Sequence, residues 1–167
     1  DQVTFDVFVG LLVACFENAV PQRWVQTGLF TNLGGTPPTS ASLVRKHRQR
    51  LWLAGSQTAP HRLYFSAIDN PEDWTVLGGG GSMDLDTGDR DPVGITALFP
   101  SFHDNFMYVA KRHSIMRITA ANGIESVVEG IGCIAHNSVV AVGDDIFFAS
   151  DRGVHRMSTT ENAGDVE

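Results

Sequence analysis

The chain alternates short apolar runs with short polar runs, and the same order of runs returns four times. Each repeat has a central apolar segment, then a polar stretch, then a second short segment that combines apolar and basic residues. The central segments start at Leu11, Leu51, Phe106 and Ile146, spaced 40, 55 and 40 residues apart. A recurring pattern of this length predicts a protein built from repeated structural units.

Each repeat also has an earlier short strand, expected at residues 4–9, 42–44, 96–99 and 138–142. Glycine, asparagine, aspartate or other polar residues separate it from the central segment, as in β-hairpins. A fourth strand at the edge is expected at residues 28–33, 74–77 and 124–128, and the glycine run at residues 78–81 marks an inserted loop. Each repeat therefore predicts a small antiparallel sheet.

The central strands are apolar on both faces, which is typical of sheets packed against a neighbour on each side. Four-stranded units of about 40–50 residues, arranged radially, are β-propeller blades. A sandwich and a solenoid are the rival all-β folds, and the long period favours the propeller. We expect a partial propeller of about four blades, at residues 1–40, 41–94, 95–135 and 136–167. The expected core side chains are Leu51, Trp52, Phe106, Tyr108, Phe147 and Phe148.

The composition fits a folded chain, because 43% of the 167 residues are hydrophobic and 19% are charged. The longest apolar run, residues 7–16, is too short to span a bilayer, and no basic segment precedes it as in a signal peptide. We expect both ends to be cuts from a longer chain. Cys15 and Cys133 have no metal-binding spacing and are expected to be buried thiols.

Charge indicates which partners are compatible with the chain. The net charge of −7 argues against a surface that wraps DNA, but it allows a wall past which DNA slides. The only dense basic cluster surrounds His47 and is expected to form a turn between two strands, either solvated or touching phosphate or an acidic partner surface. Its members, which we take as interface candidates, are Arg45, Lys46, Arg48 and Arg50.

The strongest candidate for a metal site is the acidic loop at residues 84–91. Its carboxylates, also interface candidates, are Asp84, Asp86, Asp89 and Asp91. Gly88 is misplaced for a helix–loop–helix calcium site and no glutamate closes the loop, so we expect turn and interface residues without a metal. The six histidines show no zinc spacing, and no phosphate-binding loop or nucleophile motif is present. No catalytic residue and no cofactor is predicted.

Several motifs are similar to the propeller of tailed-phage proteins, namely the tail nozzle (tail tubular) proteins and the related packaged-DNA stabilisation proteins. One is the run Asn70-Pro71-Glu72-Asp73-Trp74. The others lie at residues 50–55, 61–66, 79–86, 88–92, 111–115, 130–135, 138–140, 143–145 and 150–154. Together they cover about residues 28–158.

The resemblance implies a structural protein of the virion tail, assembled in the host cytoplasm below the portal. It implies a ring of copies of this chain, contacts with other tail or portal-adjacent proteins, and DNA that passes through the lumen or is retained there without specific binding. No membrane contact is implied. The alternatives are a propeller that binds a host-surface glycan or protein, and a propeller hydrolase or lyase. Fold alone does not choose among them.

Calcium should not stabilise the protein through the acidic loop. Asp84 and Asp86 point to one face if the segment is extended and Gly88 then bends the chain, so only two or three carboxylates converge. Calcium takes about six to eight oxygen ligands. Thermal melts with calcium and with a chelator should coincide. A saturable stabilisation that disappears in Asp84→Asn/Asp86→Asn would contradict this prediction.

Overall fold

The computed structural model describes residues 3–85, 93–101, 106–119 and 122–158. The chain divides into two compact units, residues 1–86 and 87–167. The described residues form four small antiparallel sheets, and their only helical element is the 3-10 turn η1 (His136–Ser138). The prediction of an all-β chain made of β-propeller blades is confirmed.

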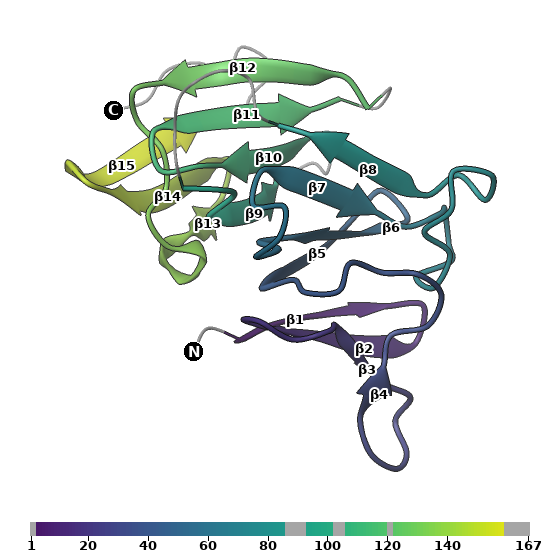
Figure 1. Cartoon of the computed structure of the whole chain (residues 1–167). Helices are drawn as coiled ribbons and strands as arrows, with labels where there is room; N and C mark the ends of the chain where they lie inside the picture. Colours follow the sequence, from purple (N-terminus) through teal and green to yellow (C-terminus); the bar gives the residue numbers. More distant parts are fainter. Residues whose placement is uncertain (1–2, 86–92, 102–105, 120–121, 159–167) are drawn as a thin grey trace. The chain divides into compact units, whose positions relative to one another are not determined.

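Unit 1 contains two blades, each a meander in which consecutive strands pair (Figure 1). Blade 1 consists of β1 (Val3–Phe8), β2 (Leu11–Phe16), β3 (Gln22–Trp24) and β4 (Thr31–Asn32). Blade 2 consists of β5 (Leu43–His47), β6 (Arg50–Ala54), β7 (Arg62–Phe65) and β8 (Gly81–Asp84). The two-residue turns Val9–Gly10 and Arg48–Gln49 have positive φ at both positions, as hairpins with a right-handed twist favour.

The two blades of unit 1 share one apolar core. The residues of this cluster are Phe8, Val13, Cys15, Leu33, Ala41, Val44, Leu51, Leu53 and Trp74. Polar contacts join the first strands of the two sheets: the Thr4 hydroxyl donates to Ser42 O at 2.8 Å and accepts from Val44 N at 3.1 Å. Strand β1 therefore lies against β5, and the two sheets pack face to face.

Unit 2 repeats this arrangement. Blade 3 consists of β9 (Ala97–Pro100), β10 (Met107–Ala110), β11 (Ser114–Ile118) and β12 (Ile124–Glu129). Blade 4 shows three strands in the described residues: β13 (Val140–Val142), β14 (Asp145–Ser150) and β15 (Gly153–Ser158). Their common core comprises Ala97, Phe99, Tyr108, Ala110, Ile115, Cys133, Ile146, Phe148 and Met157. Each unit is thus a pair of blades around its own core.

The equivalence of the central strands differs by one residue from the sequence prediction. Ala54 O accepts a hydrogen bond from Ser42 N, and Ala110 O accepts the matching bond from Thr96 N. These alanines are therefore equivalent, so Leu51 corresponds to Met107 and not to Phe106, which precedes β10. A continuous run of apolar residues shows no alternation that could fix its register. This explains why the sequence prediction misaligns the central strand of blade 3 by one residue.

The last strand of blade 2 was predicted at residues 74–77 but is β8, Gly81–Asp84. Asp73 forms a tight turn instead, because its carboxylate accepts from the amide and the hydroxyl of Thr75 at 2.9 and 2.7 Å. This turn leaves Trp74 buried in the core. The glycine run is therefore only partly a loop, since Gly81 pairs with Phe65.

The basic cluster at residues 45–50 is not a turn as a whole, contrary to the prediction. Arg45, Lys46 and His47 belong to β5 and Arg50 begins β6, so only residues 48 and 49 form the turn. His47 is buried, and its carbonyl accepts from the Trp52 indole at 3.2 Å.

The six expected core side chains divide into two groups by burial. Leu51, Trp52, Tyr108 and Phe148 are buried. Phe106 and Phe147 are only half-buried. Phe106 nevertheless packs against the core of unit 2, where the Arg117 guanidinium lies 4.7 Å from the centre of its ring.

Replacing Trp52 by alanine should cost about 3–5 kcal/mol of unfolding free energy, the usual loss for a large aromatic side chain in a core. The indole is 2% exposed and its ring centre lies 5.2 Å from that of Phe65. Denaturant melts measure the loss. Trp24→Ala is the matched control, because Trp24 is only half-buried and should cost clearly less. Equal losses would mean that Trp52 is not a core residue.

Candidate functional site

Among the described residues of unit 2, four charged or titratable side chains lie on two neighbouring turns. The β10–β11 turn carries Arg112 and His113, and the β14–β15 turn carries Asp151 and Arg152. Lys111 N donates to Ser114 O at 2.9 Å and closes the first turn. In the second turn Arg152 N donates to the Ser150 hydroxyl at 2.9 Å. We call these four residues the turn cluster.

A glycine lets the chain cross closely over the first turn. Gly132 lies in the segment that leaves β12, and a Cβ there would stand 2.1 Å from Lys111 O. Any side chain would therefore collide with the backbone of the turn. The next residue, Cys133, donates its amide to Lys111 O at 2.9 Å. The pattern Gly130-Ile131-Gly132 thus holds this segment against the β10–β11 turn.

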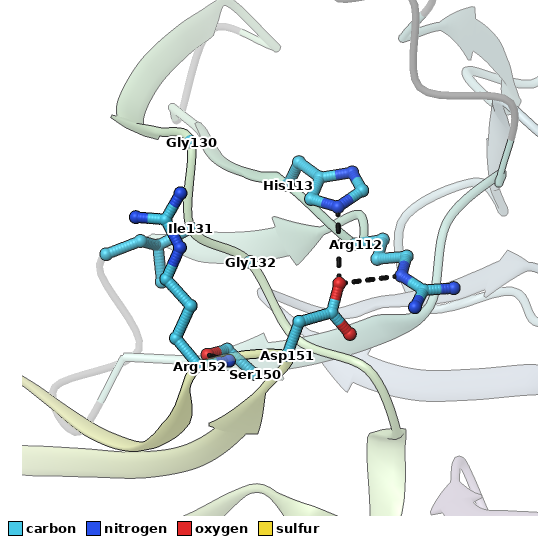
Figure 2. Close-up of a pocket in the computed structure, with 8 residues that line it drawn as sticks. All are labelled: Arg112, His113, Gly130, Ile131, Gly132, Ser150, Asp151 and Arg152. Carbon is cyan, nitrogen blue, oxygen red and sulfur yellow. Dashed lines mark hydrogen bonds and ion pairs between the residues drawn. The ribbon is translucent and has the colours of Figure 1, made fainter.

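Asp151 joins the two blades by ion pairs. One oxygen, Oδ2, accepts from Arg112 Nε at 2.8 Å and lies 3.3 Å from His113 Nε2 (Figure 2). The hydrogen bond from Arg112 lowers the pKa of the Asp151 carboxyl, and the positive charges of Arg112 and His113 add to this effect. The carboxylate therefore stays ionised at neutral pH and is a poor proton donor.

Two shallow hollows border Asp151. The first, of about 100 Å³, is lined by Arg112, His113, Gly130, Ile131, Gly132, Ser150, Asp151 and Arg152. In Figure 2 the Arg152 side chain stands beside Ile131, on the opposite side of the hollow from Arg112 and His113. The second, of about 180 Å³, is lined by Val93, Thr96, Arg112, Ile134 and Asp151. Both are small compared with ligand pockets of about 300–1,000 Å³.

This arrangement is better suited to holding blades or partners together by charge than to catalysis. Two guanidinium groups and one carboxylate leave a positive net charge, so an acidic group of a partner is the chemistry that fits. The Asp151 carboxylate is occupied by its ion pairs, and the side chains at the rim are about half exposed. Such pairs orient assembly more than they tighten it.

A charged side chain also connects the two blades of unit 1. The Glu72 carboxylate accepts from Arg23 Nη1 at 2.5 Å and from Gly34 N at 2.7 Å, so it joins the β7–β8 connection to blade 1. Next to it, a Cβ on Gly35 would lie 1.9 Å from Glu72 O, and Gly35 has φ of +74°. Glycine is required there on both counts.

Two of the predicted basic interface residues make contacts inside unit 1. Arg50 Nη1 donates to Ser66 O at 2.6 Å and to Gly79 O at 2.5 Å, while its guanidinium lies over the Phe65 ring. Lys46 N donates to the Asp6 carboxylate at 2.6 Å. Arg45 lies on β5 opposite Trp52, and Arg48 lies in the turn. Both Arg45 and Arg48 make interactions as well.

The acidic loop is described only at its start. Asp84 ends β8 and lies 3.5 Å from Arg62 on the neighbouring strand. Asp86, Asp89 and Asp91 fall outside the described residues. Within the described ranges, no three His, Cys, Asp or Glu side chains gather closely enough to hold a metal ion. Cys15 and Cys133 are free and buried, and burial raises the pKa of the Cys15 thiol.

Sequence reasoning missed the turn cluster and Glu72. The motifs at residues 70–74, 111–115 and 150–154 carry the resemblance, but the sequence does not indicate which contacts their charged residues make. One signal was available: equivalent turns of successive repeats carry opposite charges, at Arg112 in one and Asp151 in the next.

Comparisons with known proteins identify the fold but no family. No protein-family model and no curated protein matches the chain. The extracellular domain of a putative one-component system from B. thetaiotaomicron aligns with 99% of the chain at 10% identity and a TM-score of 0.72. The computationally designed Ika4 protein aligns with 94% at 11% identity and a TM-score of 0.59. The chain spans 22% of the first structure and 89% of the second.

No helix in the part of the chain that the structure describes is long and apolar enough to cross a membrane.

Asp151→Asn should lower the melting temperature at neutral pH, because asparagine keeps an acceptor for Arg112 but loses the charge. The native pKa of Asp151 lies below its ordinary value of about 3.9, so its contribution is complete above that pH and is lost as the pH falls through the native pKa. The difference in melting temperature between wild type and variant should therefore become smaller below about pH 4. Melts across pH measure it.

Asp69→Asn is the matched control, since it removes the same charge from an exposed position after β7. Added salt should also make the difference for Asp151→Asn smaller, because exposed ion pairs are screened. A difference in melting temperature that is independent of both pH and salt would show that the Asp151 charge does not stabilise the contact between the two turns.

Proposed function

We propose that this protein is a structural component of a tailed-phage particle, of the tail nozzle or head-to-tail type. In this role copies of the chain assemble into a ring below the portal, contact other tail proteins, and let DNA pass or hold it back. The chemistry of the protein is assembly, and no catalytic residue is assigned.

The placement of the resembling motifs carries the proposal. Two residues of the motif at residues 70–74 join blades 1 and 2. Glu72 binds blade 1 from the β7–β8 connection, and Trp74 packs in the core between the two blades. Asp151 and Arg112, from two later motifs, fasten blade 3 to blade 4. Glu72, Trp74, Arg112 and Asp151, which lie in the resembling motifs, thus take part in joining blades, and a defined contact between blades is what the proposed ring needs.

Charge supports the passage of DNA. With a net charge of −7, the chain presents an overall field that repels phosphate, so transit along it avoids adhesive contacts.

One observation favours the second candidate, a module that binds a host-surface glycan or protein. The β3–β4 loop carries an apolar patch, in which Trp24 stacks on Phe30 with ring centres 6.4 Å apart. Leu29 in the same loop is 89% exposed and Phe30 is 43% exposed. Aromatic side chains of this kind are common at binding surfaces.

Mass spectrometry of phage particles tests the first candidate. Particles released by the host strain that carries this gene should contain peptides of the chain, in a fixed ratio to those of the portal protein. If the chain is produced in the cells but is absent from purified particles, the proposal is wrong. Saturable binding of the purified chain to host cells, abolished in Phe30→Ala, would instead favour the second candidate.

A further inference from the structure

The blades meet through two different faces. In unit 1, blade 1 packs its face with Leu11, Val13 and Cys15 against the blade 2 face with Leu51 and Leu53. In unit 2, blade 3 packs its face with Tyr108 and Ala110 against the blade 4 face with Ile146 and Phe148. We call the face that a blade turns to its successor the leading face, and the face turned to its predecessor the trailing face.

The same two faces recur in both units. Leu51 is equivalent to Met107, so the trailing residues Leu51 and Leu53 of blade 2 correspond to Met107 and Val109 of blade 3. Tyr108 and Ala110, on the opposite face of β10, are the leading residues of blade 3. Successive side chains of a strand alternate between faces, so the assignment is consistent in both units.

The trailing face of blade 1 is apolar and partly exposed. Its residues on β1, β2 and β3 are Val3, Phe5, Val7, Leu12, Ala14, Phe16, Gln22 and Trp24. None of them is charged. Phe5 is 51% exposed and Val7 is 58% exposed, whereas the face of a sheet that is turned to solvent normally carries polar side chains. This face has the composition of an internal blade surface.

The leading face of blade 4 is also partly exposed among the described residues. Its apolar residues are Val140, Val142, Phe147, Ala149 and Val154. Val142 is 60% exposed and Val154 is 76% exposed. The charged residues on this face, Asp145 and Arg156, lie 3.7 Å apart and compensate each other. A partner blade could therefore cover the face without leaving a single charge unpaired.

We propose that a second copy of this chain covers these faces, with the leading face of blade 4 in one copy packed on the trailing face of blade 1 in the next. The contact continues the interface that already joins blades 1 and 2 and blades 3 and 4, leading face on trailing face. Because the two faces differ, the contact is heterologous, and it closes into a ring or grows into a chain of copies. This rests on the ring assembly of the proposed function and identifies the surfaces that form it.

Self-association of the purified chain tests the pairing. Sedimentation and native mass spectrometry up to about 100 µM should show oligomers that dissociate on dilution. Phe5→Asp, on the trailing face, and Val142→Asp, on the leading face, should each abolish these oligomers. Ile68→Asp is the matched control, because Ile68 is 56% exposed on the β7–β8 connection and belongs to neither face, and this variant should associate like the wild type.

Mixing the two variants gives the sharper result. Phe5→Asp keeps an intact leading face and Val142→Asp keeps an intact trailing face, so the mixture should form a one-to-one dimer that grows no further. Native mass spectrometry distinguishes this heterodimer because the two variants differ in mass. Circular dichroism checks that both remain folded, and Val7→Lys replaces Phe5→Asp if that variant is unfolded.

Three outcomes overturn the pairing: a monomeric wild type, variants that still associate, or a mixture without heterodimer. Loss of association in only one variant would indicate contact between identical faces and would also overturn it. The virion test is independent. A chain that is found in particles but is monomeric in solution contradicts only this pairing, whereas one that pairs in solution but is absent from particles contradicts only the proposed function.

Discussion

The need to cover both apolar faces of every sheet is the constraint on which the rest of this structure depends. A strand such as Arg50–Ala54 is buried along most of its length, so side chains on either face are removed from water. Burial of apolar area is the main favourable term in folding, and a small sheet alone cannot supply it. The repeat therefore makes sense only as a row of sheets, in which each covers its neighbour.

Polar contacts then determine how the sheets are aligned. Thr4, Asp6 and Glu72 connect the two sheets of unit 1 through hydrogen bonds to backbone amides or carbonyls. Asp151 does so in unit 2 through side-chain ion pairs. Hydrophobic packing is non-directional, whereas these bonds require particular distances and angles. The apolar residues thus supply the attraction and the polar residues supply the orientation.

The fold class followed from the sequence because hairpin spacing and apolar segments are local properties. Details that depend on contacts did not follow. A one-residue shift between Phe106 and Met107 leaves the apolar pattern unchanged, so only the hydrogen bonds of Ala54 and Ala110 reveal it. Trp74 looked like part of a strand until the Asp73 turn was seen. The turn cluster escaped notice because Arg112 and Asp151 are 39 residues apart and meet only when blades pack.

The core cluster that two successive sheets share within each unit has a consequence for how that unit unfolds. Each cluster draws its residues from two successive sheets, so a sheet separated from its partner exposes the apolar residues that it contributes to the cluster. The smallest cooperative element is then the pair, and amide exchange in a single sheet should require opening of its partner as well. Native-state fluctuations would accordingly expose strand residues two sheets at a time, and a protease could cleave within a strand only after such a pair of sheets has opened.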